Sequence, residues 1–251
     1  MTGNPTLNEN TFNDLKSYGS SAGAMTIQGT VNKTGILLFL ALVTASYTWG
    51  LYYKANGDPA VMTTMTAWMM AGGILGFIFA MVTSFKKEWS AFTAPVYAMC
   101  EGLFIGGISS IFDSKFHGIV LQAVMLTFGT LAALLLAYKS GIIRASDNFK
   151  RGLFAATGGI ALLYFVTFIL GLFHIQIPGI FGNGLIGIGF SLFVVVIAAM
   201  NLVVDFDFIE KGVESNAPKY MEWYAAFGLM VTLVWLYLEI LRLLSKLRSR
   251  D

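Results

Sequence analysis

Seven apolar stretches divide this 251-residue chain, and each is long enough to cross a lipid bilayer. A membrane-spanning α-helix needs about 20 consecutive, mainly apolar residues. The stretches that meet this requirement lie at about 34–53, 61–85, 91–112, 118–138, 152–173, 184–206 and 222–244. Because little chain is left between them, the sequence predicts an all-α membrane protein with seven transmembrane helices and no separate soluble domain.

The composition points to the same class. Apolar residues make up 56% of the chain and charged residues 12%, against about 25% charged residues in an ordinary soluble domain. The mean hydropathy is +0.70, so lipid is the expected solvent for most of the surface. The net charge is only +2, and the basic residues lie next to the predicted membrane edges. The lipid bilayer is therefore an expected partner, and nucleic acid is not.

The predicted domains are a polar N-terminal tail at 1–33, a membrane domain at 34–245 and a basic C-terminal tail at 246–251. Residues 1–24 are rich in Asn, Thr, Ser and Gly. Residues 25–33 are more apolar and either lie along the membrane interface or belong to a plain tail. The tail lacks the basic patch, apolar run and cleavage site of a signal peptide, so none is predicted.

Seven helices place the two termini on opposite faces of the membrane, and the Lys and Arg residues of the loops decide the orientation. Ten of these residues lie on the face of the N-terminus and five on the other face, which predicts a cytoplasmic N-terminus. The basic C-terminal tail is the part of this count that disagrees. If that tail were also cytoplasmic, one apolar segment would have to re-enter the membrane instead of crossing it.

Several carboxylates lie in the predicted helices, where a charge costs about 3 kcal/mol on insertion scales. Asp205 and Asp207 are two residues apart, about 200° around a helix, so an intact helix cannot aim both at one partner. Asn201 shares a face with Asp205, which favours Asp205 as the inward-facing residue. The alternative is that both aspartates are solvated at a helix end.

Two glutamates lie deeper in the predicted helices. Glu239 shares a face with Arg242, so it is either a local ion pair or a functional carboxylate. Glu101 is near the middle of its helix with no basic residue within ten positions on either side. It therefore needs a partner from another helix, a water-filled cavity or a proton. Carboxylates that converge in such a bundle share protons, and their oxygens suit Ca²⁺ or a proton relay.

The sequence predicts no enzyme and no cofactor. His117 and His174 have no cysteine or paired histidine that would complete a zinc site. Ser191 has no histidine within a predicted helix that could activate it as a nucleophile. The single cysteine, Cys100, cannot form an internal disulfide.

Four segments resemble the Bax inhibitor-1 family, which contains the transmembrane BAX inhibitor motif, and most closely its bacterial branch. They are Met25-Thr-Ile-Gln-Gly-Thr, Tyr97-Ala-Met-Cys-Glu-Gly-Leu-Phe-Ile-Gly106, Asn201-Leu-Val-Val-Asp-Phe-Asp-Phe-Ile-Glu210, and Glu222-Trp-Tyr-Ala-Ala-Phe-Gly with Leu236-Tyr-Leu-Glu-Ile-Leu. Their order and the seven-helix layout extend the resemblance over nearly the whole chain beyond the tail.

The resemblance implies a bundle of six helices around a central seventh, in a bacterial inner membrane. It also implies a calcium leak controlled by pH, in which aspartates of helices 6 and 7 share a proton. A basic residue at the cytoplasmic end of helix 2 helps to hold the closed state. Asp205 matches the helix-6 aspartate, and Lys86 or Lys87 lies near the basic position.

The helix-7 aspartate is where this chain departs from the family. The family's Leu-Tyr-Leu-Asp resembles Leu236-Tyr-Leu-Glu239, but Glu239 follows Asp205 by 34 residues, farther than the family pattern places it. Along a helix that begins at Glu222, Glu239 lies about 25 Å from the start, and Asp205 lies at the cytoplasmic end. A pair of Asp205 with Glu239 therefore requires a later helix start. The alternatives are Asp205 with Glu222 and Glu239 with Glu101.

The resulting hypothesis is a cation leak channel, sensitive to pH, that is gated by intramembrane carboxylates sharing protons. The alternatives are a non-conducting regulator that binds other membrane proteins through glycine-rich faces at Gly102 and Gly106, and a proton-coupled transporter of a small solute. Asp205 is also a candidate Ca²⁺ ligand. The candidate proton and ion residues are Asp205, Asp207, Glu101, Glu222 and Glu239, with Lys86, Lys87 and Arg242 as basic partners of the closed state.

Overall fold

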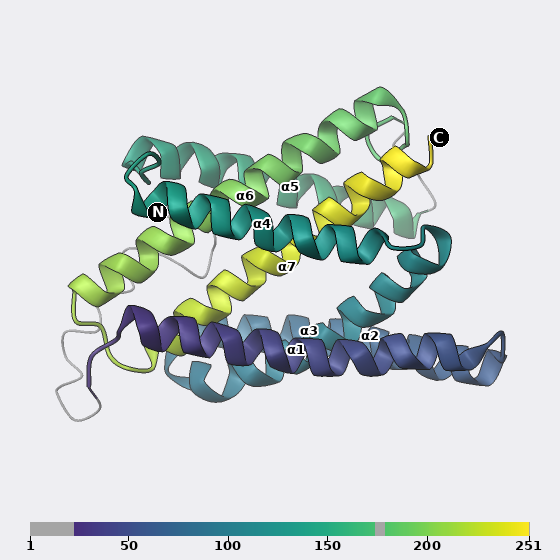
Figure 1. The fold of residues 1–251 in the computed structure, drawn as a ribbon, viewed down its shortest axis with the longest axis horizontal. Coiled ribbons are helices and arrows are strands. Elements are labelled where there is room, and N and C mark those ends of the chain that lie inside the picture. Colours follow the sequence, from purple (N-terminus) through teal and green to yellow (C-terminus); the bar gives the residue numbers. More distant parts are fainter. Residues whose placement is uncertain (1–22, 174–178, 251) are drawn as a thin grey trace. The chain divides into compact units, whose positions relative to one another are not determined.

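The computed structural model describes residues 23–173 and 179–250, which form seven α-helices and one short 3₁₀ helix (Figure 1). All seven α-helices are long and apolar enough to cross a membrane, and the described residues contain no β-strand. The predicted fold class is therefore confirmed. The elements are α1 (Ile27–Ala55), α2 (Pro59–Phe85), η3 (Lys87–Trp89), α3 (Ser90–Lys115), α4 (Ile119–Lys139), α5 (Asp147–Leu172), α6 (Leu185–Glu214) and α7 (Met221–Arg248).

The described residues pack into two compact units. The first, called the α1–α3 unit, lies within Asn10–His117 and Ile209–Met230 and includes the end of α6 and the start of α7. The second, called the α4–α5 unit, comprises Gly118–Phe208 and Val231–Asp251 and includes the rest of α6 and α7. The expectations for residues 1–22 and for His174 fall outside the described residues.

Small residues let α3 pack closely against both α1 and α2 within the α1–α3 unit. A Cβ atom on Gly102 or Gly106 would overlap the backbone of α1, and one on Gly72 of α2 would overlap the carbonyl oxygen of Cys100. The spacing of four residues puts Gly102 and Gly106 on one face of α3. These glycines allow the close helix contact that small residues provide in membrane proteins.

Helix α1 begins at Ile27, seven residues before the predicted start, because Thr26 caps it. The backbone of Thr26 is extended, and its hydroxyl oxygen accepts a hydrogen bond from the Gly29 N–H at 2.9 Å. Such a cap satisfies one of the free N–H groups of the first turn. Residues 27–33, predicted as tail or as an interfacial segment, are therefore part of the helix.

Helix α6 ends at Glu214, eight residues later than predicted. Asn216 has a left-handed backbone with φ 52°. Its N–H donates to the Val213 carbonyl oxygen at 3.0 Å, and the Ala217 N–H donates to that of Gly212 at 3.0 Å. These two bonds form a Schellman motif, which closes the helix. The helix therefore continues without a break past both aspartates.

Helix α7 is the most buried of the seven α-helices. In its apolar stretch 61% of the residues are buried, against 11–44% in those of the other six. It extends to Arg248, so part of the predicted C-terminal tail is helical.

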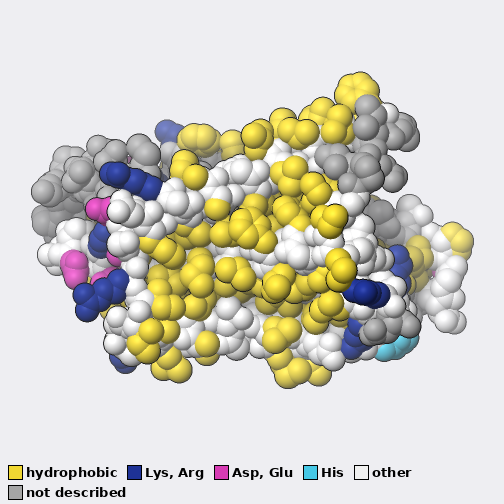
Figure 2. Space-filling view, turned by 90° about the horizontal axis from the view of Figure 1, so that it is seen from above, with side chains coloured by type: hydrophobic (Ala, Val, Ile, Leu, Met, Phe, Trp, Pro, Cys, Tyr) yellow, Lys and Arg dark blue, Asp and Glu magenta, His cyan; other side chains and the backbone are white. Residues whose placement is uncertain are grey.

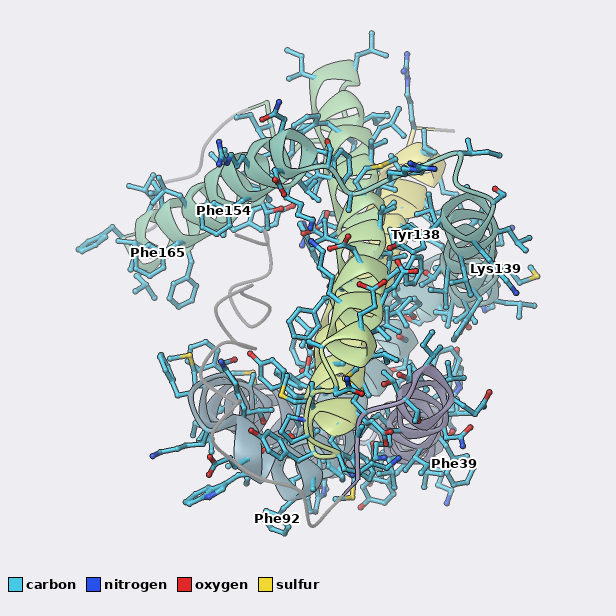
Figure 3. All side chains as sticks on the ribbon, turned by 90° about the vertical axis from the view of Figure 1, so that its left-hand side faces the viewer. Phe39, Phe92, Tyr138, Lys139, Phe154 and Phe165 are labelled. Atoms are coloured by element: carbon cyan, nitrogen blue, oxygen red, sulfur yellow. The ribbon has the colours of Figure 1, made fainter. Side chains whose placement is uncertain are left out.

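In other helices, large apolar side chains such as Phe39, Phe92 and Phe165 are exposed, as expected for lipid contact (Figure 3). Hydrophobic side chains also cover much of the face in Figure 2.

Candidate functional site

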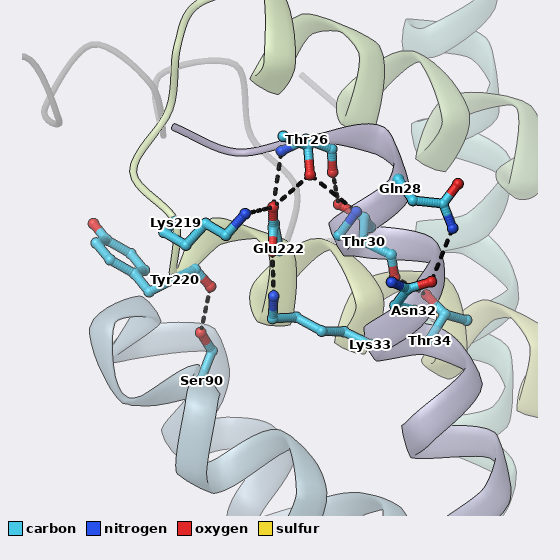
Figure 4. Close-up of polar contacts among 11 residues, drawn as sticks. Thr26, Gln28, Thr30, Asn32, Lys33, Thr34, Ser90, Lys219, Tyr220 and Glu222 are labelled. Atoms are coloured by element: carbon cyan, nitrogen blue, oxygen red, sulfur yellow. Dashed lines mark hydrogen bonds and ion pairs between the residues drawn. The ribbon is translucent and has the colours of Figure 1, made fainter. Parts of the chain in front are cut away.

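Glu222, in the first turn of α7, lies at the centre of a polar cluster in the α1–α3 unit (Figure 4). Its side chain is fully buried and forms ion pairs with Lys33 of α1 and with Lys219, whose Nζ is 2.8 Å from Oε1. The Thr26 N–H and hydroxyl both donate to Oε1 at 2.9 Å. Two lysines thus balance the carboxylate, and Glu222 links the start of α1 to the start of α7.

The surroundings of this cluster are closely fitted. A Cβ atom on Gly29 would overlap the Glu222 carboxylate, which would have to move away from its present position. Of the two basic candidates after α2, Lys87 lies 5.9 Å from the ring of Tyr224 in α7. Lys86 is exposed at the end of α2. Lys87 is therefore the candidate that contacts α7.

Glu101 lies near the middle of α3 and is partly buried. Its carboxylate faces Gly76 of α2, where an added Cβ atom would be 3.1 Å from Oε2. Within residues 23–173 and 179–250, no hydrogen bond or ion pair engages this carboxylate. Glu101 thus differs from Glu222, although both are glutamates of apolar helices in the same unit.

Asp205 and Asp207 have different surroundings in the α4–α5 unit. Asp205 is 1% exposed, in agreement with the predicted inward position. Asp207 forms an ion pair with Lys150 of α5 at 2.6 Å. On the Asp205 face, the Asn201 side-chain amide donates to the Thr157 hydroxyl of α5 at 3.0 Å. An intact helix therefore separates the two aspartates, as their spacing predicts.

Glu239 forms a cluster with Arg242 and Tyr164 in the same unit. Its side chain is 3% exposed; Arg242 Nη1 donates to its two oxygens at 2.9 and 3.1 Å, and the Tyr164 hydroxyl donates to Oε1 at 2.9 Å. Arg242 also donates to the Tyr164 oxygen at 2.7 Å and lies 5.2 Å from its ring centroid. The structure thus has the predicted local ion pair, and the carboxylate of Glu239 is not paired with Asp205.

The other two pairings, Asp205 with Glu222 and Glu239 with Glu101, join residues of different units and stay predictions. Among the described residues, no three or more His, Cys, Asp or Glu side chains gather where they could hold a metal ion. Asp205 as a Ca²⁺ ligand stays a prediction.

An open cavity of about 580 Å³ lies beside the Glu239 cluster. Lys246, 5% exposed, donates from Nζ to the carbonyl oxygens of Gly187 at 3.0 Å and Ile180 at 3.4 Å. The sequence analysis missed Tyr164 and Lys246. For Tyr164, the available signal was a hydroxyl group within an apolar helix. Lys246 was missed because it was assigned to the C-terminal tail. The cavity is lined by Tyr164, Thr167, Phe168, Phe181, Asn183, Arg242, Ser245 and Lys246.

Seven apolar helices that carry buried acids define a class, the multi-pass α-helical membrane proteins. A scan against protein-family models matches residues 4–249 to the family described as Bax inhibitor 1 like. The match covers nearly the whole chain, so this protein belongs to the Bax inhibitor 1 like family, and the resemblance is confirmed. Searches of curated proteins and of solved structures returned no match.

Proposed function

We propose that this protein passes Ca²⁺ or another cation across the membrane in a pH-dependent way, with intramembrane carboxylates as the gate. The surroundings of Glu101 are the observation that supports the proposal. Glu101 lies in mid-helix without a hydrogen bond or ion pair in the described chain. Since a charge at bilayer depth costs about 3 kcal/mol on insertion scales, this carboxyl needs a proton, water or a cation. A group that exchanges a proton for a cation makes conduction depend on pH.

The other acids divide into two groups. Glu222, Glu239 and Asp207 each have a basic residue within ion-pair distance, so they hold helices together in our proposal. Asp205 is fully buried in α6, at the position where the resemblance places a proton-sharing aspartate. Glu101 and Asp205 are therefore the two residues to which we assign proton-dependent gating, each within its own unit.

Calcium flux into liposomes that contain the purified protein tests the proposal. We expect flux at pH 6, 7 and 8 to differ, and Glu101→Gln and Asp205→Asn to reduce that difference, because neither variant side chain titrates. Glu88→Gln, at an exposed position outside the α-helices, is the matched control and should behave as the original protein. Flux that is equal at the three pH values and in all variants would remove the mechanism.

The regulator alternative uses glycine-rich faces to bind another membrane protein. Gly102 and Gly106 face α1 of the same chain, which does not favour these two positions as that surface. The transporter alternative remains distinct in one respect: it predicts that proton movement in the same liposomes requires a solute gradient. Calcium flux without any added solute would therefore favour the channel.

A further inference from the structure

The cavity of the α4–α5 unit carries more positive than negative charge. Arg242 and Lys246 are four residues apart and lie on one face of α7. Glu239 balances one of these two charges. Among the described residues, Lys246 donates only to backbone carbonyl oxygens, and no carboxylate lies within ion-pair distance of it. A buried ammonium without an anionic partner is costly, so an anion at this place would be stabilised.

Donor groups remain for such an anion. Arg242 uses only Nη1 in its described hydrogen bonds, which leaves Nη2 and Nε, and its side chain is 40% exposed. Lys246 has three N–H groups and makes two described bonds. Guanidinium and ammonium groups on one wall suit an anion with several oxygens, and phosphate is the biological group that fits best.

The position of the cavity favours a lipid as the source of that phosphate. Its lining comes from the last turns of α5 and α7 and from the segment before α6. If every helix crosses the membrane, these helix ends belong to the same side of it. Because α5 has 26 residues, about 39 Å, it exceeds the hydrocarbon core of about 30 Å, and its end reaches the head groups. Phe168 and Phe181 add an apolar wall beside the cations.

We propose that this cavity binds phosphate, supplied by the head group of an anionic phospholipid or as the free ion. Basic pockets between transmembrane helices bind anionic head groups in other membrane proteins. The volume of about 580 Å³ holds a head group and the start of its acyl chains. The site is separate from Glu101 and Asp205, so it does not depend on the proposed channel function.

Binding of phosphatidylglycerol and phosphatidylcholine to the purified full-length protein in detergent tests this site. We expect phosphatidylglycerol to bind more tightly, and Lys246→Gln to weaken its binding about tenfold or more, since the lost hydrogen bond is to a charged group. Arg248→Gln is the matched control. It removes the same charge from the same last turn of α7 and should retain binding, because Arg248 does not line the cavity. Ser245→Asp adds a negative charge to the lining without replacing Lys246, and it should also weaken the binding of phosphatidylglycerol.

Inorganic phosphate separates the two sources. If it raises the thermal unfolding midpoint of the original protein but not of Lys246→Gln, and the two lipids bind equally, free phosphate is the ligand. If phosphatidylglycerol binds more tightly than phosphatidylcholine and inorganic phosphate has no effect on the unfolding midpoint, the lipid head group is the ligand. Equal binding of both lipids without a phosphate effect, or equal weakening by Lys246→Gln and Arg248→Gln, overturns the proposal. Ser245→Asp gives the same decision if Lys246→Gln does not fold.

Discussion

At the residue scale, Arg242 and Glu239 of the Glu239 cluster do not contribute equally to stability. Glu239 is buried, whereas Arg242 is 40% exposed and can turn toward water. Removing the cation leaves a buried carboxylate with only the Tyr164 hydroxyl. Removing the carboxylate leaves a cation that can be solvated. Breaking a buried pair is costly mainly because of the charge that stays behind.

We therefore expect Arg242→Gln to destabilise the protein more than Glu239→Gln does. Arg242→Gln should lower the free energy of unfolding by about 2–3 kcal/mol, below most buried pairs because Arg242 is partly solvated. Glu239→Gln should cost about 1 kcal/mol, since the amide oxygen still accepts hydrogen bonds. Denaturation in mixed detergent micelles measures both. The double variant should be more stable than Arg242→Gln alone, and an equal or larger loss for Glu239→Gln would contradict this account.

The carboxylate of Glu222 also links two helices, α1 and α7. The substitution Glu222→Gln replaces this carboxylate by a neutral amide. That variant leaves Lys33 and Lys219 close together without the negative charge between them. We expect a loss of about 2 kcal/mol in the free energy of unfolding, moderated because Lys219 is 45% exposed. Thermal unfolding in detergent measures it, with the exposed Glu88→Gln as the control. A loss no larger than that of the control would mean that the ion pairs do not hold α1 to α7.

At the element scale, hydropathy predicted every helix but not where α1 begins or α6 ends. An apolar window cannot detect the Thr26 cap or the Asn216 turn, because each depends on a few backbone hydrogen bonds in polar sequence. The candidate acids were likewise predictable, since a single sequence is enough to find a carboxylate within an apolar stretch. The basic residues that pair with these acids were not predictable. Lys33 and Lys150 reach their carboxylates from helices distant in sequence, and only packing brings them together.

The contact between α1 and α3 depends on the absence of a side chain. Gly102→Ala puts a Cβ atom against the α1 backbone and should lower the free energy of unfolding by about 1–3 kcal/mol, the usual cost of overpacking. Gly35→Ala in α1 is the matched control, because nothing lies within 4 Å of its Cβ position. The control should be neutral or gain about 0.5–1 kcal/mol from helix propensity. Equal effects on detergent unfolding would show that α3 does not approach α1 this closely.

At the scale of the whole molecule, the two units divide the candidate residues between them. Glu101 and Glu222 belong to the α1–α3 unit, and Asp205 and Glu239 belong to the α4–α5 unit. Both α6 and α7 contribute residues to each unit, so they are the elements through which one unit can affect the other.

Seven membrane-spanning helices require that the α4–α5 loop and the C-terminus lie on opposite faces. In a Cys100→Ala background, which removes the single cysteine, Ser140→Cys and Ser249→Cys place one thiol at each position. In right-side-out vesicles, a membrane-impermeant maleimide should label Ser249→Cys directly. It should label Ser140→Cys only after permeabilisation, because the ten basic residues on the face that holds this loop predict that the face is cytoplasmic. Labelling of both positions from the same side would mean that one apolar helix does not cross, and a reversed pattern would place the N-terminus outside.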